Sequence, residues 1–373
     1  MRKLIPFIIL GILALILLIK FGPVLGDMFP TAAKIVTLNH FPTLKETNNK
    51  TNILLLGIGG GSHDGPNLTD TIMVVSLDNK TNKITLISIP RDLWIPDIND
   101  GNGEKINEVY ADGQNSQNRG LLLAKAVVGK VTGLDIHYGF RLDFTGFVRA
   151  VNEVGGLDVT VDRVLDDYEY PISGEEDNPC GHTDAEITEY AKNASDSGAL
   201  EFFPCRYKHL HFNTGLVHMD GETALEFVRS RHAAGAEGSD FARSARQQKV
   251  IEAFRNKIFS ASTIFNPGRI LNLYGIVKDS IDTDINQQEV ALFLRLAPKV
   301  KDSTIETAVI DYGDSLQGRS GLLINPPISS EYHFASVLVP RIGSGKYTEI
   351  QQYVACEVTK GKCTVSPTPS STP

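Results

Sequence analysis

The stretch ILLLGIGGGSHDGPNLTDTIMVVSLDNKTNKITLISIP, residues 53–90, decides the fold of this chain. It contains three apolar runs, ILLL, DTIMVVSLD and KITLISIP, which are separated by a glycine-rich loop and by the turn NKTN. The runs are nearly continuously apolar, which is typical of central strands covered on both faces. Segments with helical period alternate with further strand-like segments along the rest of the chain. The sequence therefore predicts an α/β fold, an α-β-α sandwich around a mixed central sheet.

The glycine-rich loop does not match a nucleotide-binding motif. A P-loop requires a lysine after its last glycine, and none follows here. A dinucleotide fingerprint opens a helix, whereas the element expected next is a strand. Two alternatives stay open, a simple turn or a loop through which backbone and acidic side chains approach an ion. The side chains concerned are His63, Asp64 and Asp70.

Charged residues lie at the ends of two of the predicted strands. Asp70 directly precedes an apolar run, and open α/β sheets bind ligands at strand ends. Its carboxylate could bind Mg²⁺ or cap a turn. Arg91 and Asp92 follow the next buried strand, where the alternative to a binding role is an ordinary surface ion pair. Lys105 lies a few residues farther on.

A basic segment stands out in an otherwise acidic protein. The net charge is −8, so the chain as a whole has no general attraction for nucleic acid. The segment 229–257 contains seven Lys or Arg residues and only three acidic residues. Arg229 and Arg231 share a face only if the backbone is extended there, whereas Arg243 and Gln247 share a helix face. One guanidinium group can donate two parallel hydrogen bonds to phosphate oxygens. We therefore favour phosphate binding by this segment over a solvated charged surface.

The first 25 residues predict a membrane anchor. Residues 4–19 are all apolar or glycine and follow Arg2 and Lys3. This pattern favours an uncleaved transmembrane signal anchor at 4–25 over a cleaved signal peptide. By the positive-inside rule, residues 1–3 are then cytoplasmic and the bulk of the chain is extracellular, on a single-pass protein of the cell membrane. Residues 26–50 form a linker.

The four cysteines of an exported chain predict two disulfides, for which three pairings are possible. Short loops cost less entropy to close, which favours Cys180–Cys205 and Cys356–Cys363. The first pair would staple a polar, acidic excursion from the core at 163–212. The main domain is expected at 51–309, an accessory C-terminal extension at 310–363 and a disordered Pro/Ser/Thr-rich tail at 364–373.

Several collinear blocks of this sequence resemble the LytR-CpsA-Psr family. They run from about residue 52 to 259, and their number makes the resemblance specific. The blocks are NILLLGIG, TDTIMVVSLD, ITLISIPRDLWI, KINEVYADG, FTGFVRAVNEVGGLDVTVD, HMDGETALEFVRSR and SDFARSARQQKVI.

The resemblance implies a membrane-anchored glycopolymer phosphotransferase. Such an enzyme moves a glycan from a polyprenyl-pyrophosphate carrier to peptidoglycan or another envelope acceptor, with Mg²⁺ or Mn²⁺ as cofactor and an apolar cleft for the lipid. Partners are therefore the lipid-linked glycan, the acceptor and the bilayer, not nucleic acid. Carried over by position, the catalytic residues are Asp70, Arg91, Arg229 and Arg231, and the pyrophosphate ligands are Arg91, Arg229, Arg231, Arg243, Gln247 and Lys105.

Two departures from the family pattern concern the metal. Many members have an arginine two residues before the aspartate equivalent to Asp70, where this chain has Leu68. They also carry an acid directly after the first strand, where this chain has the longer loop GIGGGSHD. We hypothesise that Asp64 in this loop replaces the missing acid and binds the metal with Asp70. Two other functions stay open, a non-catalytic polyprenyl-phosphate-binding protein and a lipid-carrier pyrophosphatase.

Overall fold

The computed structural model describes residues 43–61, 65–193, 199–264, 266–286, 289, 292–293, 300, 303–314 and 319–366. The predicted anchor at 4–25 and the predicted metal ligand Asp64 lie outside these residues. Most of the predicted linker and of the predicted tail lie outside them as well. No helix within the described part of the chain is both long enough and apolar enough to cross a membrane.

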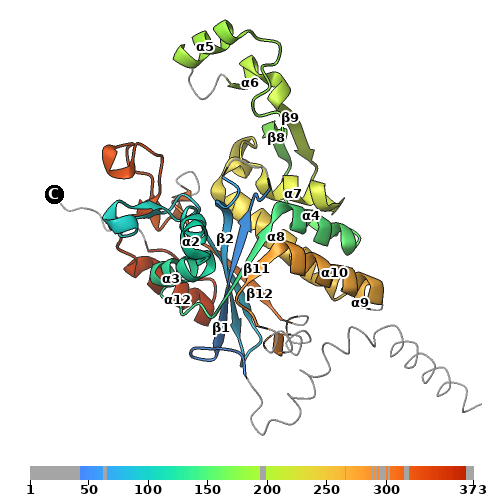
Figure 1. Ribbon diagram of the computed structural model, residues 1–373. Coiled ribbons are helices and arrows are strands. Elements are labelled where there is room, and N and C mark those ends of the chain that lie inside the picture. The colour runs from blue at the N-terminus through green and yellow to red at the C-terminus, as the bar shows by residue number, and fades with distance from the viewer. Residues whose placement is uncertain are drawn as a thin grey trace, which may run out of the picture.

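A mixed β-sheet forms the centre of the fold (Figure 1), as the sequence predicts. Within the described residues it has six strands in the order β11-β6-β1-β2-β3-β12. The pair β1–β2 is antiparallel and so is β2–β3, whereas β6 and β12 run parallel to their neighbours β1 and β3. The three apolar runs are the three central strands. The bounds are β1 Lys50–Ile58, β2 Thr69–Asp78, β3 Ile84–Ile89, β6 Tyr138–Asp143, β11 Ile281–Thr283 and β12 Ile305–Val309.

Helices cover both faces of this sheet, which explains why its strands β1, β2 and β3 contain nearly continuous apolar runs. Leu54 and Leu56 of β1 belong to a core cluster shared with α2, α3 and α12. The intervening Leu55 belongs to a cluster on the opposite face, against Ile251 of α8. Figure 1 shows α2, α3 and α12 on one side of the sheet and α8, α4 and α10 on the other. The helices are α2 Val109–Gln117, α3 Gly120–Thr132, α4 Phe144–Glu153, α7 Gly221–Arg229, α8 Asp240–Ile258, α9 Ala261–Ile264, α10 Pro267–Ser280 and α12 Thr348–Thr359.

Residues 163–212 consist of a buried base and a projecting tip. The base is an antiparallel ribbon of β8 and β9, whose side chains Leu165 and Phe212 are buried in a second core cluster with α4, α7 and α8. The tip carries two helices and the Cys180–Cys205 disulfide, and Figure 1 shows it extending away from the sheet. Only the tip thus corresponds to an excursion from the core. The bounds are β7 Leu157–Val161, β8 Leu165–Pro171, α5 Asp184–Asn193, α6 Ala199–Phe202, η3 Pro204–Arg206, β9 Tyr207–Phe212 and β10 Gly215–Met219.

The segment after residue 309 packs into the main core. Ile350 and Val354 of α12 are buried in the same cluster as the central strands, and α12 contacts α3 and β3. The Cys356–Cys363 disulfide closes the end of this helix, so both disulfides have the predicted pairing. The smaller elements are β4 Trp94–Ile95, η1 Asn99–Gly101, β5 Glu104–Lys105, η4 Gly235–Gly238, β13 Gly313–Asp314, β14 Arg319–Ser320, β15 Leu323–Ile324, η5 Ser330–Tyr332 and β16 Val339–Pro340.

The β4–β5 hairpin carries a buried acid with a strongly shifted pKa. Glu104 is 4% exposed and its Oε1 has no hydrogen-bond partner among the described residues. Burial, reinforced by the neighbouring Asp112, raises the pKa of Glu104 to about 8. The folded protein therefore holds a proton here that the unfolded chain releases near the ordinary glutamate pKa. The bound proton stabilises the fold at low pH, and this contribution is lost as the pH rises toward 8.

We expect the Glu104→Gln variant to lack this pH dependence. Between pH 5 and pH 8.5 the wild-type protein should lose about 2 to 4 kcal/mol of unfolding free energy through this carboxyl group. Glutamine is neutral at both pH values, so the variant should be the more stable protein at pH 8.5. Thermal unfolding at the two pH values measures the difference. Asp100→Asn, at an exposed position in the same hairpin loop, is the control. Equal pH dependence in the wild type and the Glu104 variant would contradict the prediction.

Candidate active site

A charged pocket of about 280 Å³ opens between the start of β2, the segment after β3 and the C-terminal end of α7. Its lining includes Asp70, Arg91, Arg229 and Arg231, the four residues that the resemblance identifies as catalytic. These come from three separate parts of the sequence, and the fold brings them to one edge of the sheet. The lining also includes Asp167, which the sequence analysis did not single out.

Asp70 is the centre of the charge network. Its Oδ1 accepts a hydrogen bond from Arg91 Nη1 at 2.6 Å and another from Arg231 Nη2 at 2.7 Å. Burial opposes ionisation of this carboxyl group, but the positive charges of Arg231 and Arg91 outweigh it and hold its pKa below the usual value. Asp70 is therefore a carboxylate at neutral pH. Both arginine hydrogen bonds are made to Oδ1.

The backbone at the end of α7 brings Arg229 and Arg231 into the same pocket. Asp220 caps the start of this helix by accepting a hydrogen bond from the Thr223 backbone N–H. The helix ends at Arg229, and Ser230 leaves the helical conformation with φ −50° and ψ 132°. The side chains of both arginines line the pocket. The Arg229 guanidinium lies 4.5 Å from the centre of the Phe144 ring, a cation–π contact at the pocket wall.

Asp167 of β8 holds the segment that carries these arginines. It is 0% exposed, and its Oδ2 accepts hydrogen bonds from Ser230 Oγ at 2.7 Å, from the Arg231 backbone N–H at 3.2 Å and from the His232 backbone N–H at 3.3 Å. Its Oδ1 accepts from the Glu169 backbone N–H at 3.0 Å. A buried carboxylate with this many donors is a fixed anchor. Asp167 therefore sets the position of Arg231 from outside the basic segment.

Two backbone links position Arg91 relative to Asp70. The carbonyl oxygen of Asn107 accepts a hydrogen bond from the Thr69 backbone N–H at 3.0 Å, and the Asn107 N–H donates to the Arg91 carbonyl at 3.3 Å. Lys105, a predicted pyrophosphate ligand, is not among the residues that line the pocket. Its Nζ lies 2.8 Å from one oxygen of Asp92, whose other oxygen is 3.6 Å from Arg91 Nε. Lys105 is thus linked through Asp92 to Arg91, which lines the pocket.

The helix α8 supports the pocket from behind. Gln247 Nε2 donates to Thr71 Oγ1 at 3.0 Å, next to Asp70. Arg243 is 9% exposed and does not line the pocket. Burial, repulsion from Arg91 and repulsion from Arg243 together lower the pKa of Arg231, which nevertheless stays a cation. Gln247 therefore holds the residue next to Asp70, and Arg243 adds positive charge close to Arg231 without lining the pocket.

Arg246, on the same helix, has a structural role. Its Nη2 donates to the Ser230 carbonyl at 2.7 Å and its Nε donates to the Phe227 carbonyl at 2.9 Å. Its Nη1 contacts the Glu237 carboxylate at 3.0 Å. Arg246 thus caps the C-terminal end of α7 and fixes the turn that follows.

The glycine-rich loop forms one wall of the pocket through Gly59 and Gly65. Gly60 has a φ of +68°, and a Cβ atom there would lie 2.8 Å from the Cβ of Asp143, so both the backbone conformation and the close approach require glycine. The loop closes through a hydrogen bond from the Gly60 N–H to the Pro66 carbonyl at 2.9 Å. Leu68 lines the pocket directly. The loop therefore belongs to the site and is not a distant turn.

The arrangement is suited to binding a dianion together with a metal ion. The pocket lining has three arginines against two aspartates. The net charge of these five side chains is +1, whereas a pyrophosphate diester carries about two negative charges, so about one negative charge would remain for a metal ion to compensate. Mg²⁺ is usually bound through one or two carboxylates together with substrate phosphates and water. Asp70 fits that donor set, because it is an ionised carboxylate in the pocket and both arginine hydrogen bonds are made to its Oδ1.

The chain thus combines a mixed α/β fold with a pocket at strand ends that is lined by three arginines. The LytR_cpsA_psr family model matches residues 30–326, and the chain belongs to this family. It is 27% identical over 301 residues to the polyisoprenyl-teichoic acid–peptidoglycan teichoic acid transferase TagU of Bacillus cereus (strain AH820), with 78% of this chain and 82% of that protein covered. It is 25% identical to TagU of Oceanobacillus iheyensis, with 84% and 87% covered.

Solved structures share the fold. The protein gbs0355 from Streptococcus agalactiae matches with a TM-score of 0.55 and 22% identity over 83% of this chain and 88% of that one. TagV of B. subtilis matches with a TM-score of 0.53 and 23% identity over 84% and 98%. The predicted family and the predicted enzyme class, a glycopolymer phosphotransferase, are confirmed, since the named relatives are transferases of this kind.

Proposed function

We propose that this protein transfers a glycopolymer from a polyprenyl-pyrophosphate carrier to peptidoglycan or another envelope acceptor, at the outer face of the membrane. The observation that carries the proposal is the convergence of Arg91, Arg229 and Arg231 on one pocket with Asp70. Three guanidinium groups from two separate segments, one after β3 and one at the end of α7, are suited to bind a diphosphate, because each offers paired donors to phosphate oxygens. The named relatives act on a polyisoprenyl-linked teichoic acid and peptidoglycan.

In the proposed reaction, a hydroxyl oxygen of the acceptor forms a bond to the phosphorus that carries the glycan. The bond from that phosphorus to the bridging oxygen breaks, the polyprenyl monophosphate leaves, and the acceptor hydroxyl loses its proton to the surroundings. Phosphoryl transfer of this kind depends mainly on positioning and on stabilising charge that develops on the phosphate oxygens. Arg91 and Arg231 do both, because their contacts with Asp70 hold their guanidinium groups in place before substrate binds.

Asp70 would also hold Mg²⁺, or Mn²⁺, which supplies Lewis-acid stabilisation of the phosphate oxygens when bound. Its low pKa keeps the carboxylate ionised over the whole physiological range. Asp64 is proposed as the second acidic ligand. Leu68 and the ring of Phe144 provide apolar surface within the pocket, next to the charged groups, for the first part of the lipid.

The experiment uses the purified full chain, a polyprenyl-pyrophosphate-linked glycan labelled in the sugar, peptidoglycan and Mg²⁺. Label joined to peptidoglycan together with released polyprenyl monophosphate supports the proposal. Release of glycan phosphate into solution without attachment would identify a lipid-carrier pyrophosphatase, for which water is the acceptor. Saturable binding of the lipid without turnover of any kind would identify a non-catalytic binding protein. Each of the last two outcomes contradicts the proposed transfer.

Removal of the metal should abolish most of this transfer. We expect chelation to lower the rate by about 10²-fold or more, because the ion stabilises phosphate charge in the transition state, and added Mg²⁺ to restore it. The Asp70→Asn variant should show neither the activity nor the response to Mg²⁺. Rates measured across a Mg²⁺ titration test both statements. An Asp64→Ala variant with unchanged Mg²⁺ dependence and turnover would exclude Asp64 as a ligand while leaving Asp70 in place.

A further inference from the structure

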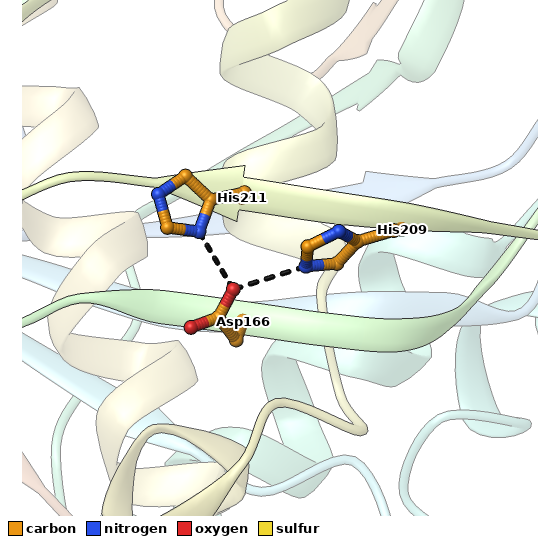
Figure 2. Close-up of side chains that lie close together, drawn as sticks. All are labelled: Asp166, His209 and His211. Carbon is orange, nitrogen blue, oxygen red and sulfur yellow. Dashed lines mark hydrogen bonds and ion pairs between the residues drawn. The ribbon is translucent and has the colours of Figure 1, made fainter.

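A second group of ion-binding side chains lies on the solvent side of the β8–β9 ribbon, outside the arginine pocket (Figure 2). Asp166 of β8 contacts two histidines of β9, with its Oδ1 3.0 Å from His209 Nε2 and 2.6 Å from His211 Nδ1. The three ligand atoms all lie within 4.8 Å of one another. Figure 2 shows both imidazole rings turned toward the same carboxylate oxygen.

The strand pairing, and not an accidental choice of side-chain rotamers, brings these three residues together. Along β9 the buried residues Leu210 and Phe212 alternate with the exposed His209 and His211, which fixes both histidines on the solvent face. Asp166 is the direct partner of His211 across the antiparallel ribbon. Its neighbours in β8 are Leu165, which is buried, and Asp167, which faces the pocket. Asp166 therefore faces solvent because the alternation of the strand places it there.

Two imidazoles and one carboxylate form a donor set for a borderline divalent transition metal such as Zn²⁺. Within the described part of the chain, this is the one group of three or more His, Cys, Asp or Glu side chains with ligand atoms this close together. Zinc takes three such protein ligands and completes a tetrahedron with water at an exposed site. Mg²⁺ prefers oxygen ligands in an octahedral arrangement and does not compete for imidazole nitrogen. The set thus differs in chemistry from the donor set at Asp70.

We propose that Asp166, His209 and His211 bind one Zn²⁺ ion. The ion replaces the two hydrogen bonds between the imidazoles and Asp166. Because a histidine binds a metal ion only in its neutral form, binding of Zn²⁺ releases protons from any protonated histidine. The site lies where β8 supports the arginine segment. The Asp166 carbonyl accepts a hydrogen bond from the Ala234 backbone N–H at 2.7 Å, and the next residue, Asp167, anchors Arg231. A bound ion cross-links β8 to β9 at this point and stabilises the native ribbon.

Isothermal titration of the full 373-residue chain with ZnCl₂ tests the proposal, on protein that carries no histidine tag and has been stripped with a chelator. One saturable Zn²⁺ site per chain is expected, together with a higher unfolding temperature in the presence of Zn²⁺. Each of the variants His209→Gln, His211→Gln and Asp166→Asn should weaken Zn²⁺ binding by at least about 10- to 100-fold. Losses of this size are typical when only a residue that hydrogen-bonds to a metal ligand is changed, so loss of a ligand itself should cost no less. Excess Mg²⁺ should not displace the ion.

The chain contains a matched control in a second exposed His–Asp pair. His218 Nδ1 lies 2.7 Å from Asp158 Oδ1, and these residues are also direct partners across an antiparallel ribbon. This pair lacks a second imidazole, so His218→Gln should leave Zn²⁺ binding unchanged. Tetrahedral Co²⁺ absorption in the unmutated protein reports the ligand set without relying on any variant. Absence of saturable Zn²⁺ binding, binding unchanged in all three ligand variants, or equal loss in His218→Gln would each overturn the proposal.

Discussion

The Arg231→Ala variant is expected to lose transfer activity by roughly 10³-fold while it keeps its fold, a size typical of removing a positioned cation from a phosphoryl-transfer site. Arg231 combines three properties in the site. Its Nη2 contacts Asp70 Oδ1 at 2.7 Å, it lines the pocket, and its backbone is held by Asp167. Removal of the side chain takes one cation from the proposed phosphate site and one of the two arginine partners from Asp70.

The fold should tolerate this change because Asp70 keeps its contact with Arg91 at 2.6 Å. The buried carboxylate is therefore not left without a cation, which is the situation that destabilises proteins strongly. We expect the circular dichroism spectrum and the unfolding temperature to change little. Loss of activity can then be assigned to the chemistry of the site.

Arg231→Lys separates charge from geometry. Lysine keeps the positive charge but has a single ammonium group in place of the planar fork that contacts Asp70 and a phosphate at once. We expect this variant to retain part of the activity, between the wild type and Arg231→Ala. Arg149→Ala, which removes an exposed arginine on α4, is the control and should transfer at the wild-type rate. Activity of Arg231→Ala within about tenfold of the wild type would exclude Arg231 from the proposed phosphate site.

The central sheet and four pocket residues could be predicted because their signals are local. Apolar runs define β1, β2 and β3. A charged residue directly before or after such a run in the sequence lies at an end of the strand, where open α/β sheets bind ligands. Asp70 and Arg91 both satisfy this condition, and both line the pocket. Arg229 is the last residue of a helix capped by Asp220, Arg231 comes two positions later, and the backbone at Ser230 between them is no longer helical.

The role of Asp167 and the position of Lys105 could not be predicted from local sequence signals. Asp167 lies in a polar, acidic segment without clear periodicity, and its role depends on contacts with residues more than sixty positions away. Nothing near Asp167 in the sequence indicates that β8 and β9 form a ribbon under the arginine segment. Lys105 lies close to Arg91 in sequence, but the β4–β5 hairpin directs it to Asp92 and not to the pocket. The long-range pairing of short segments thus decides which charged residues reach the site.

The Asp167→Asn variant is expected to lose both stability and activity. The carboxylate accepts three hydrogen bonds from Ser230, Arg231 and His232 through Oδ2, whereas an asparagine amide nitrogen in that place would face two backbone N–H donors. Leaving buried donors unsatisfied costs about 1 to 3 kcal/mol each, so we expect about 3 kcal/mol of destabilisation in total. Thermal unfolding measures this loss. Asp158→Asn, at an exposed position on β7, is the control and should unfold like the wild type.

Transfer by Asp167→Asn, measured well below its unfolding temperature, should fall by roughly 10²-fold, because a shift of about 1 Å in a positioning group has effects of this size. A purely structural residue would not produce this loss in the fully folded variant. A double-mutant cycle with Arg231→Ala shows whether Asp167 acts through that arginine. If it does, adding Asp167→Asn to Arg231→Ala costs little further activity, since the group that Asp167 positions is already gone. If the two losses multiply in full, Asp167 contributes to transfer independently of Arg231, and its assignment as the anchor of that side chain is wrong.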